Sequence, residues 1–343
     1  MIDPRQNPSF DGHEDVVFVG GEAKGFAGVI AVHNTALGPA AGGCRIWDYD
    51  SAADALTDAL RLSRGMTYKN AMADLPLGGG KAVIYRINTD RVEAFRSFGD
   101  EVEKLGGRYI TAEDVGATVS DMRAIADRTS YVAGIPKEHG RAGGDPSPWT
   151  ALGVFLSIKA LLGDSVKGRT IAVQGVGAVG YHLCKRLADE GAKLVVADVN
   201  KANLQRAEAL GVQIAPVDQI HAVGADLFSP CALGAGLNLN TIPELSAPIV
   251  CGAANNQLAT DDDGARLVAR GITCAPDYVV NAGGIINVSA EYLGETETAV
   301  EARVRAIAPR LLRVLETAKS EGLTPHQAAD RVVRERLAAA RKG

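Results

Sequence analysis

An apolar strand, a glycine-rich turn and a helix in succession constrain this chain more than any other feature. The apolar run Thr170–Gln174 leads into the turn GVGAVG at 175–180, and a helical pattern follows through Leu187. Asp198 ends the next apolar run, 18 residues after Gly180. This combination is the fingerprint of a dinucleotide-binding α/β fold. The alternative is a glycine turn in an α/β fold that binds no nucleotide.

Each part of the fingerprint predicts one contact. Gly175 permits the tight turn, Gly177 lets the backbone approach the pyrophosphate, and Gly180 allows close packing of the helix on the strand. The N-terminus of the helix that follows supplies free N–H groups for the phosphates, and Ala178 and Val179 of the turn are further candidate cofactor-binding residues.

Asp198 is predicted to accept hydrogen bonds from the adenosine ribose hydroxyls, with Val199 beside it. Its carboxylate would repel a 2′-phosphate, and the next residues include no arginine, although Lys201 is near. The sequence therefore favours NAD over NADP. A loop cap is the alternative role for Asp198.

The patterning divides the chain near residue 140. The second half alternates short apolar runs with helical patterns, which is typical of a parallel, doubly wound sheet. The first half also alternates strands with helices, which suggests a second α/β domain. The segment HGRAGGDPSPW (139–149) is dense in Gly and Pro and indicates a linker or hinge. We expect two domains.

Two lysines twelve residues apart mark the first half. Lys69 lies near the end of a helix capped by Ser51, and Lys81 follows three glycines. Three consecutive glycines cost conformational entropy, so the backbone must approach something closely there. A lysine in a crowded cleft beside another cation loses its proton more readily, which suits proton transfer. The alternative is that both lysines are solvated surface charges.

An acidic pair, Glu113 and Asp114, follows the strand-like run 108–112. Ligands of α/β sheets gather at the carboxyl ends of strands, so a carboxylate here near Lys81 could carry protons. The alternative is an N-cap for the next helix.

Seven segments, in order, resemble the glutamate/leucine/phenylalanine/valine dehydrogenase family. They are GPAAGGCRIW, MTYKNAMADLPLGGGK, GRYITAEDVG, QGVGAVGYHLCK, SPCALGA, CGAANNQL and APDYVVNAGGIINV. The resemblance covers about residues 15–335 and is strongest to the leucine and phenylalanine branches. It implies an α/β protein with a cleft between its two domains. The first domain, at 1–140, binds substrate, carries the catalytic residues and forms the oligomer, and the second, at 141–320, is an NAD-binding Rossmann domain. A C-terminal helix at 321–343 packs back on the first domain.

The resemblance also implies roles. Lys69 holds the substrate carboxylate with help from Asn281, Lys81 is the catalytic lysine, and Asp114 is its proton-transfer partner. Thr150 and Asn255 match positions that contact the nicotinamide part of NAD, and Ala253 is a further implied cofactor-binding residue. The asparagines could instead be turn residues of loops. The implied reaction transfers a hydride from the substrate Cα to NAD, and water then yields a 2-oxo acid and ammonia. Closure about the 139–149 hinge would exclude water.

The substrate side chain is predicted to be apolar. Glutamate-specific members of the family carry a lysine where this chain has Ala41, before Gly42 and Gly43, and a carboxylate buried without a cation is costly. The predicted apolar lining is Ala41, Ala112, Ile285 and Val288. Ala41 leaves room for phenylalanine, whereas Ile285 and Val288 favour a smaller substrate. One methylene changes the binding free energy by only about 1–3 kcal/mol, so these four residues alone do not decide between the two substrates. We expect leucine and other branched-chain substrates, with phenylalanine as the alternative.

Composition and charge argue against several other classes. The net charge of −5 comes without a basic patch, which argues against nucleic acid. No apolar run reaches ~20 residues and no signal-peptide core is present, so we expect a cytoplasmic protein without a membrane segment. Five dispersed cysteines argue against disulfides and zinc, and no metal is expected.

Two other functions remain as alternatives. None of the six histidines lies in a motif that supports a hydroxy-acid dehydrogenase. A non-catalytic NAD-binding protein would need Lys81 or Asp114 to be lost, and both are present. A homo-oligomer is expected, and the short tail after Leu337 favours a dimer over an octamer.

Overall fold

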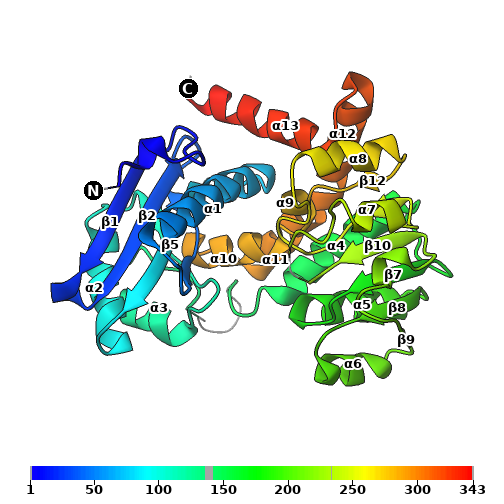
Figure 1. The fold of residues 1–343 in the computed structure, drawn as a ribbon, viewed down its shortest axis with the longest axis horizontal. Helices are drawn as coiled ribbons and strands as arrows, with labels where there is room; N and C mark the ends of the chain where they lie inside the picture. Colours follow the sequence, from blue (N-terminus) through cyan, green and yellow to red (C-terminus); the bar gives the residue numbers. More distant parts are fainter. Residues whose placement is uncertain (1, 136–141, 233, 342–343) are drawn as a thin grey trace. The chain divides into compact units, whose positions relative to one another are not determined.

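The computed structural model describes residues 2–135, 142–232 and 234–341 (Figure 1). The chain divides into two compact units. The first comprises Met1–Gly144, Asn287–Glu297 and Val333–Gly343, and the second comprises Asp145–Ile286 and Thr298–Val332. Three helices, α10 (Gly283–Leu293), α11 (Glu297–Arg305) and α13 (Pro325–Ala340), contribute residues to both units.

The first unit is built on a mixed sheet whose main path has the order β1-β2-β5-β3-β6, with β4 paired to β5. Strands β1 and β2 are antiparallel, β2 and β5 are antiparallel, and β3 and β4 run parallel to β5. The strands are β1 (Asp15–Gly21), β2 (Phe26–Asn34), β3 (Ala40–Ala41), β4 (Cys44–Ile46), β5 (Gly78–Ile87) and β6 (Tyr109–Ile110).

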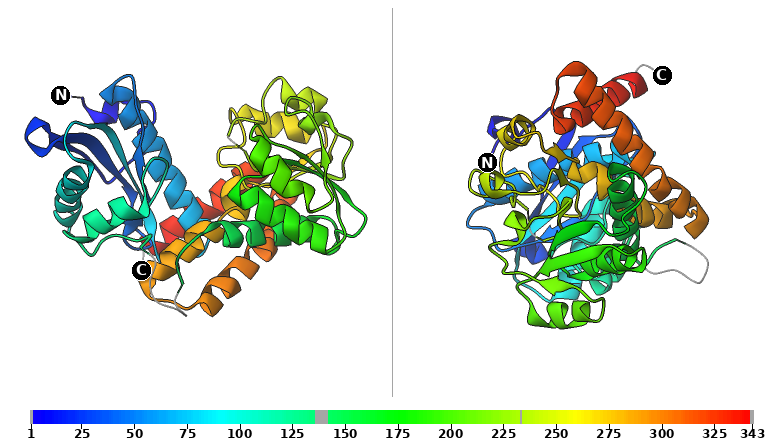
Figure 2. Two further views of the ribbon diagram at one scale, coloured as in Figure 1. Left: turned by 90° about the horizontal axis from the view of Figure 1, so that it is seen from below. Right: turned by 90° about the vertical axis from the view of Figure 1, so that its right-hand side faces the viewer.

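Helices cover both faces of this sheet (Figure 2, left). Their bounds are α1 (Ala52–Met72), α2 (Arg91–Glu103) and α3 (Val119–Ala126), with short 3-10 turns at η1 (Pro4–Gln6) and η2 (Glu22–Lys24). On one face, Leu56 and Leu60 of α1 pack on Val29 of β2 in one apolar cluster. On the other face, α2 and α3 form the larger cluster, which contains Phe95 and Met122. Strand β5 is therefore buried between two layers of helix.

The second unit contains a parallel sheet in the order β12-β11-β10-β7-β8-β9. In chain order this is 3-2-1-4-5-6, the order of a dinucleotide-binding doubly wound sheet. The strands are β7 (Thr170–Gln174), β8 (Lys193–Ala197), β9 (Gln213–Ile214), β10 (Leu227–Pro230), β11 (Ile249–Val250) and β12 (Thr273–Cys274). The predicted α/β fold with a doubly wound parallel sheet is confirmed.

The helices of the second unit lie before, between and after these strands in the chain. They are α4 (Ser147–Leu161), α5 (Ala178–Asp189), α6 (Lys201–Glu208), α7 (Thr241–Glu244), α8 (Asp262–Ala269), α9 (Asp277–Val280), α11 (Glu297–Arg305) and α12 (Ile307–Glu321), with the turn η3 (Ile220–Ala222). None of the helices that the structure describes is long and apolar enough to cross a lipid bilayer.

The linker predicted at 139–149 extends too far, because its last three residues belong to a helix. Ser147, Pro148 and Trp149 form the first turn of α4. Proline suits the first turn of a helix, where its missing N–H has no intrahelical acceptor, so Pro148 is compatible with a helix that begins at Ser147. Residues 139–141 of the predicted linker lie outside the described residues.

Candidate active site

Helix α1 and strand β5 carry the two lysines that the sequence singles out. The helix begins after Ser51, whose hydroxyl accepts a hydrogen bond from the Asp54 N–H at 3.2 Å. Leu56 and Leu60 are fully buried against the sheet, and Lys69 lies in the last turn, half-buried. The strand begins with the glycine triplet and presents Lys81 as its fourth residue. The predicted capped helix is thus confirmed.

The glycine triplet allows α1 to lie directly on β5. A Cβ atom added at Gly79 would stand 2.1 Å from the backbone nitrogen of Thr67, two residues before Lys69. One added at Gly42 would stand 1.9 Å from the carbonyl oxygen of Gly80. The close approach predicted for the triplet is confirmed, and its partner is the protein's own backbone. It sets the separation between the segments that carry Lys69 and Lys81.

Asn70 ties the two segments together with polar contacts. Its Nδ2 donates to the carbonyl oxygen of Gly78 at 2.6 Å and to that of Ala41 at 3.4 Å, and its side chain is fully buried. An N–H donated to a buried carbonyl satisfies both groups where water is excluded. The residue after Lys69 is therefore anchored to the start of the strand that carries Lys81.

Lys81 and Asp114 form an ion pair in which the lysine is buried and the aspartate is half-buried. Nζ of Lys81 lies 2.9 Å from Oδ2 of Asp114, and the lysine side chain is 6% exposed. The Asp114 loop is pressed on Gly43, because a Cβ there would stand 2.4 Å from the carbonyl oxygen of Glu113. The proposed N-cap alternative is wrong, since Thr118 caps α3. The structure thus brings together two distant residues that the sequence selected separately.

Arg45 is a third member of this cluster, and sequence reasoning missed it. Its Nε donates to the same oxygen, Oδ2 of Asp114, at 3.0 Å, and its Nη1 donates to Oδ2 of Asp58 at 2.9 Å. Burial raises the pKa of Asp114, but Lys81 and Arg45 outweigh burial and bring that pKa below its ordinary value. The only signal in the sequence that could have identified Arg45 was its positive charge directly after the GGC turn.

The residues of the predicted apolar pocket fall in different places. Ala41 lies in β3, where it is paired with Gly79 of β5, and is buried. Ala112 accepts a backbone hydrogen bond from Cys44 and is half-buried. On α10, Val288 belongs to the first unit and Ile285 to the second, and both are half-buried. Ala41 and Ala112, with Gly42 and Gly43, therefore lie in the unit that contains Lys81.

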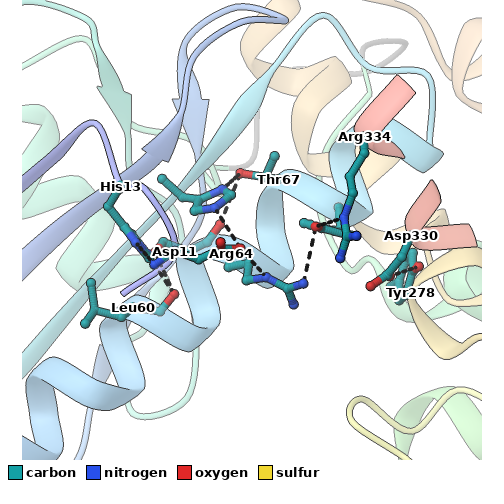
Figure 3. Close-up of polar contacts among 11 residues, drawn as sticks. Asp11, His13, Leu60, Arg64, Thr67, Tyr278, Asp330 and Arg334 are labelled. Carbon is teal, nitrogen blue, oxygen red and sulfur yellow. Dashed lines mark hydrogen bonds and ion pairs between the residues drawn. The ribbon is translucent and has the colours of Figure 1, made fainter. Parts of the chain in front are cut away.

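A polar cluster packs behind α1, on the side of the N-terminal segment. Nδ1 of His33 lies 2.7 Å from Oγ1 of Thr67, and the rings of His13 and His33 meet edge to face at 4.8 Å. Nε2 of His13 lies 3.0 Å from the Leu60 carbonyl oxygen (Figure 3). Burial lowers the pKa of His33 to about 4, so this imidazole is neutral near pH 7. Neutral histidines therefore support the helix that carries Lys69.

Tyr68, which precedes Lys69, is held from two directions. Arg64 donates to its hydroxyl at 3.2 Å and lies 4.4 Å above its ring, while Arg334 of α13 donates to the same hydroxyl at 3.4 Å. Arg64 is paired in turn with Asp11 at 2.7 Å. The C-terminal helix thus helps to hold the end of α1.

The glycine turn of the second unit has the geometry that a pyrophosphate needs. Gly175 has φ +92°, and a Cβ at Gly180 would stand 2.1 Å from the Gly175 carbonyl oxygen. A Cβ at Gly177 would meet nothing within 4 Å, so the space in front of this residue is open. Ala178 and Val179 form the first turn of α5. These residues fit the dinucleotide fingerprint.

Asp198 is bonded to this turn and to its own loop. Its Oδ2 accepts from the Val176 N–H at 2.8 Å and from Nδ2 of Asn203 at 3.2 Å, and its Oδ1 accepts from the Asn200 N–H at 2.7 Å. The side chain is half-exposed, and Val199 beside it is 87% exposed. The carboxylate therefore supports its loop, as the alternative reading held, and still faces solvent next to the turn.

Four other predicted positions lie in the second unit. Asn281 is buried, and its Nδ2 donates to the Ala253 carbonyl oxygen at 3.2 Å and to Oδ1 of Asn255 at 3.0 Å. Within the described residues, Oδ1 of Asn281 is buried without a hydrogen-bond partner. Thr150 lies on α4, where its hydroxyl donates to the Pro146 carbonyl oxygen. The structure thus brings Asn281, Ala253 and Asn255 together.

Comparison with known proteins gives the family. The model "Glu/Leu/Phe/Val dehydrogenase, dimerisation domain" matches residues 13–131, and the model "Glutamate/Leucine/Phenylalanine/Valine dehydrogenase" matches residues 196–343. The chain belongs to this family. Leucine dehydrogenase of Bacillus subtilis is 48% identical over 95% of this chain and 91% of its own length. Valine dehydrogenase of Streptomyces coelicolor is 45% identical over 96% of this chain and 93% of its own length.

A solved structure shows the same fold. The crystal structure of L-tryptophan dehydrogenase from Nostoc punctiforme has a TM-score of 0.86, with 41% identity over 97% of this chain and 98% of that chain. As a member of the Glu/Leu/Phe/Val family, the protein is an amino-acid dehydrogenase, and its chemistry requires a nicotinamide cofactor. The resemblance drawn from the sequence motifs is confirmed. The described residues contain no group of three or more His, Cys, Asp or Glu side chains that could hold a metal ion.

Proposed function

We propose that the protein catalyses the reversible, NAD-dependent oxidative deamination of an apolar L-amino acid, leucine or another branched-chain substrate, to a 2-oxo acid and ammonia. The observation that carries this proposal is the ion pair of the buried Lys81 with Asp114, whose Nζ and Oδ2 atoms are 2.9 Å apart. A lysine and a carboxylate in contact can pass a proton between them, which an amine oxidation requires. The open turn at Gly177 supports the cofactor part.

Each residue of the pair has a separate task in the proposal. When bound, NAD accepts the hydride that leaves the substrate Cα. Asp114 receives the proton of the substrate amine, and Lys81 activates the water that attacks the resulting iminium carbon. The Lys81 ammonium also stabilises the oxygen of the carbinolamine. Collapse of this intermediate releases ammonia and the 2-oxo acid.

Lys69 binds the substrate carboxylate in this proposal, with Asn281 as its helper. Lys69 is positioned through its neighbours, since Tyr68 and Asn70 are both anchored. Nδ2 of Asn281 already donates to the 253–255 loop. Its contact with a carboxylate would therefore require that donor to exchange partners. Gly42 and Gly43 complete the substrate side of the site, next to Lys81.

NAD, rather than NADP, is the proposed cofactor. Asp198 presents a carboxylate beside the glycine turn, where a 2′-phosphate would be repelled. Gly175, Gly177 and Gly180, with the first residues of α5, would hold the pyrophosphate, and Asp198 and Val199 the adenosine ribose. Thr150 and Asn255 are proposed to contact the nicotinamide part, and Ala253 is proposed as a further cofactor-binding residue.

Ala41 supports an apolar substrate. It is buried in β3 and places no cation where a substrate carboxylate would need one. The leucine and valine enzymes at 48% and 45% identity support a branched-chain side chain over phenylalanine. The tryptophan enzyme at 41–43% identity is a reason to include aromatic substrates in the assay.

The remaining expectations stay part of the proposal. The segment at 1–140 would bind substrate and form a homo-oligomer, a dimer rather than an octamer, and the segment at 141–320 would bind NAD. Two further expectations stay predictions. One is that segment 321–343 forms a C-terminal helix that packs on the first domain, and the other is that a cleft lies between the two domains. All five cysteines are free thiols, which fits the cytoplasm.

A substrate panel tests the proposal. The purified protein is mixed with NAD or NADP and with leucine, valine, isoleucine, phenylalanine, tryptophan or glutamate, and formation of the reduced cofactor is followed by its absorbance. We expect activity with NAD and the branched-chain amino acids, weaker activity with aromatic ones, and none with glutamate. Absence of activity across the panel, with NAD binding intact, would refute the proposed reaction.

A further inference from the structure

One oxygen atom of Asp114 contacts two cations. Oδ2 lies 2.9 Å from Nζ of Lys81 and 3.0 Å from Nε of Arg45. Among the described residues, no hydrogen bond or ion pair engages the other oxygen, Oδ1. The two oxygens of this carboxylate therefore differ: one is held by cations, and the other remains able to accept a proton.

Arg45 is itself fixed on its far side. Nη1 donates to Oδ2 of Asp58 at 2.9 Å, and the Tyr49 hydroxyl donates to the same Asp58 oxygen. The Arg45 side chain is 24% exposed and that of Asp58 is 27% exposed, so water screens this arrangement only in part. A guanidinium held at both ends has little freedom to leave Asp114.

The anchor of Arg45 belongs to the helix that carries the proposed carboxylate-binding lysine. Asp58 and Lys69 are both in α1, 11 residues apart, which is close to three helical turns. They therefore lie on the same face of α1. One rigid helix thus positions both the anchor of Arg45 and Lys69.

We propose that Arg45 is a positioning residue for proton transfer: it holds Oδ2 of Asp114, so that the carboxylate stays ionised and Oδ1 receives the proton of the substrate amine. This inference rests on the proposed function. In the step, an N–H bond of the substrate ammonium breaks, an O–H bond forms at Oδ1, and the electron pair remains on nitrogen. Arg45 touches neither the substrate nor the reacting atoms.

The charged groups around Asp114 determine the direction in which its pKa should move when Arg45 is removed. Burial acts to raise its pKa, whereas Lys81 on β5 and Arg45 on β4 lower it. Burial also raises the pKa of Cys44, Tyr109 and Glu113, and of these only Glu113 titrates in the acid range. Removing Arg45 would therefore raise the pKa of Asp114, and proton acceptance would begin at a higher pH.

The Arg45→Gln variant tests the inference through the pH dependence of kcat/KM. A neighbouring arginine lowers an aspartate pKa by about 1–3 units, so the acid limb should move up by about that amount. Arg45→Lys retains the charge and should restore most of the wild-type profile. Arg108→Gln is the matched control, since it removes a cation paired with Asp15 on the surface. The control should leave the limb unchanged.

A second readout does not depend on turnover. The pKa of Asp114 is measured by ¹³C NMR of labelled aspartate carboxyls without substrate, and the signal is assigned with Asp114→Asn. We expect a higher pKa in Arg45→Gln. Arg45→Met, which keeps the apolar stem of the side chain, replaces Arg45→Gln if the latter does not fold.

The outcomes separate the two proposals. If the wild type is inactive but the Asp114 pKa is raised in the variant, the proposed function is refuted and the electrostatic role of Arg45 is supported. An active wild type whose variant loses kcat equally at every pH, with an unchanged Asp114 pKa, would overturn the inference. Arg45 would then serve only to support the loop.

Discussion

Replacing Gly79 by alanine should damage both stability and catalysis. The new Cβ would stand 2.1 Å from the Thr67 nitrogen and 2.1 Å from Thr67 Oγ1. Ordinary contacts lie near 3.5 Å, so α1 and β5 would have to separate by more than about 1 Å. Overpacking of this kind costs about 1–3 kcal/mol, and a 1 Å displacement of catalytic groups costs about 100-fold in rate. We expect a lower Tm and a kcat/KM about 100-fold below wild type.

Gly65→Ala is the matched control for this prediction. Gly65 lies on the same helix, is exposed, and an added Cβ there meets nothing within 4 Å. Alanine is favoured over glycine in a helix by about 0.8–1 kcal/mol, so this variant should be slightly more stable and fully active. Thermal unfolding and steady-state kinetics measure both variants. Wild-type kinetics in Gly79→Ala would refute the idea that α1 and β5 set the separation of the two lysines.

Three further predictions concern single side chains. Lys81→Ala should lower kcat by about 10²–10⁴-fold with unchanged NAD affinity, measured by turnover and fluorescence titration; normal turnover would remove Lys81 from the mechanism. Asp198→Ala should weaken NAD binding and narrow the preference for NAD over NADP, as Kd values for both cofactors will show; an unchanged ratio would leave Asp198 as a loop cap only. Burial lowers the pKa of His33 from 6.5 to about 4, so the unfolded chain takes up the proton first as pH falls. The folded state should therefore lose about 2 kcal/mol between pH 7 and pH 5, a loss that His33→Gln should abolish in denaturant titrations; equal losses in both proteins would contradict this assignment.

The sequence predicted those parts of the fold that depend on local pattern. Thr170–Gln174 was identified as a strand at its observed bounds, and Ser51 as a helix cap. Both follow from properties of neighbouring residues, namely a short continuous apolar run and a side-chain acceptor for free N–H groups. The two-residue strand Gln213–Ile214 was missed, because both residues are exposed and form a strand only by pairing with β8.

The candidate site was predictable where a motif or a family resemblance marked a residue, as for Lys81 and Asp114. It was not predictable where a role depends on contacts between distant segments. Arg45 meets Asp114 across 69 positions of the chain, and nothing in its local sequence reveals that contact. His33 lies in an apolar strand, and its bond to Thr67 exists only because α1 packs on β2. Such contacts can be identified only once the tertiary structure is known.

Tracing the hydride from the substrate Cα to the cofactor is the most direct test of the central claim. The protein is supplied with NAD and L-leucine that carries deuterium at Cα, and the mass of the reduced cofactor is measured after a brief turnover. The account predicts a cofactor one mass unit heavier than that formed from unlabelled leucine, together with ammonia and the 2-oxo acid. Reduced cofactor without deuterium, or deuterium released only to water, would contradict hydride transfer from Cα and with it the proposed reaction.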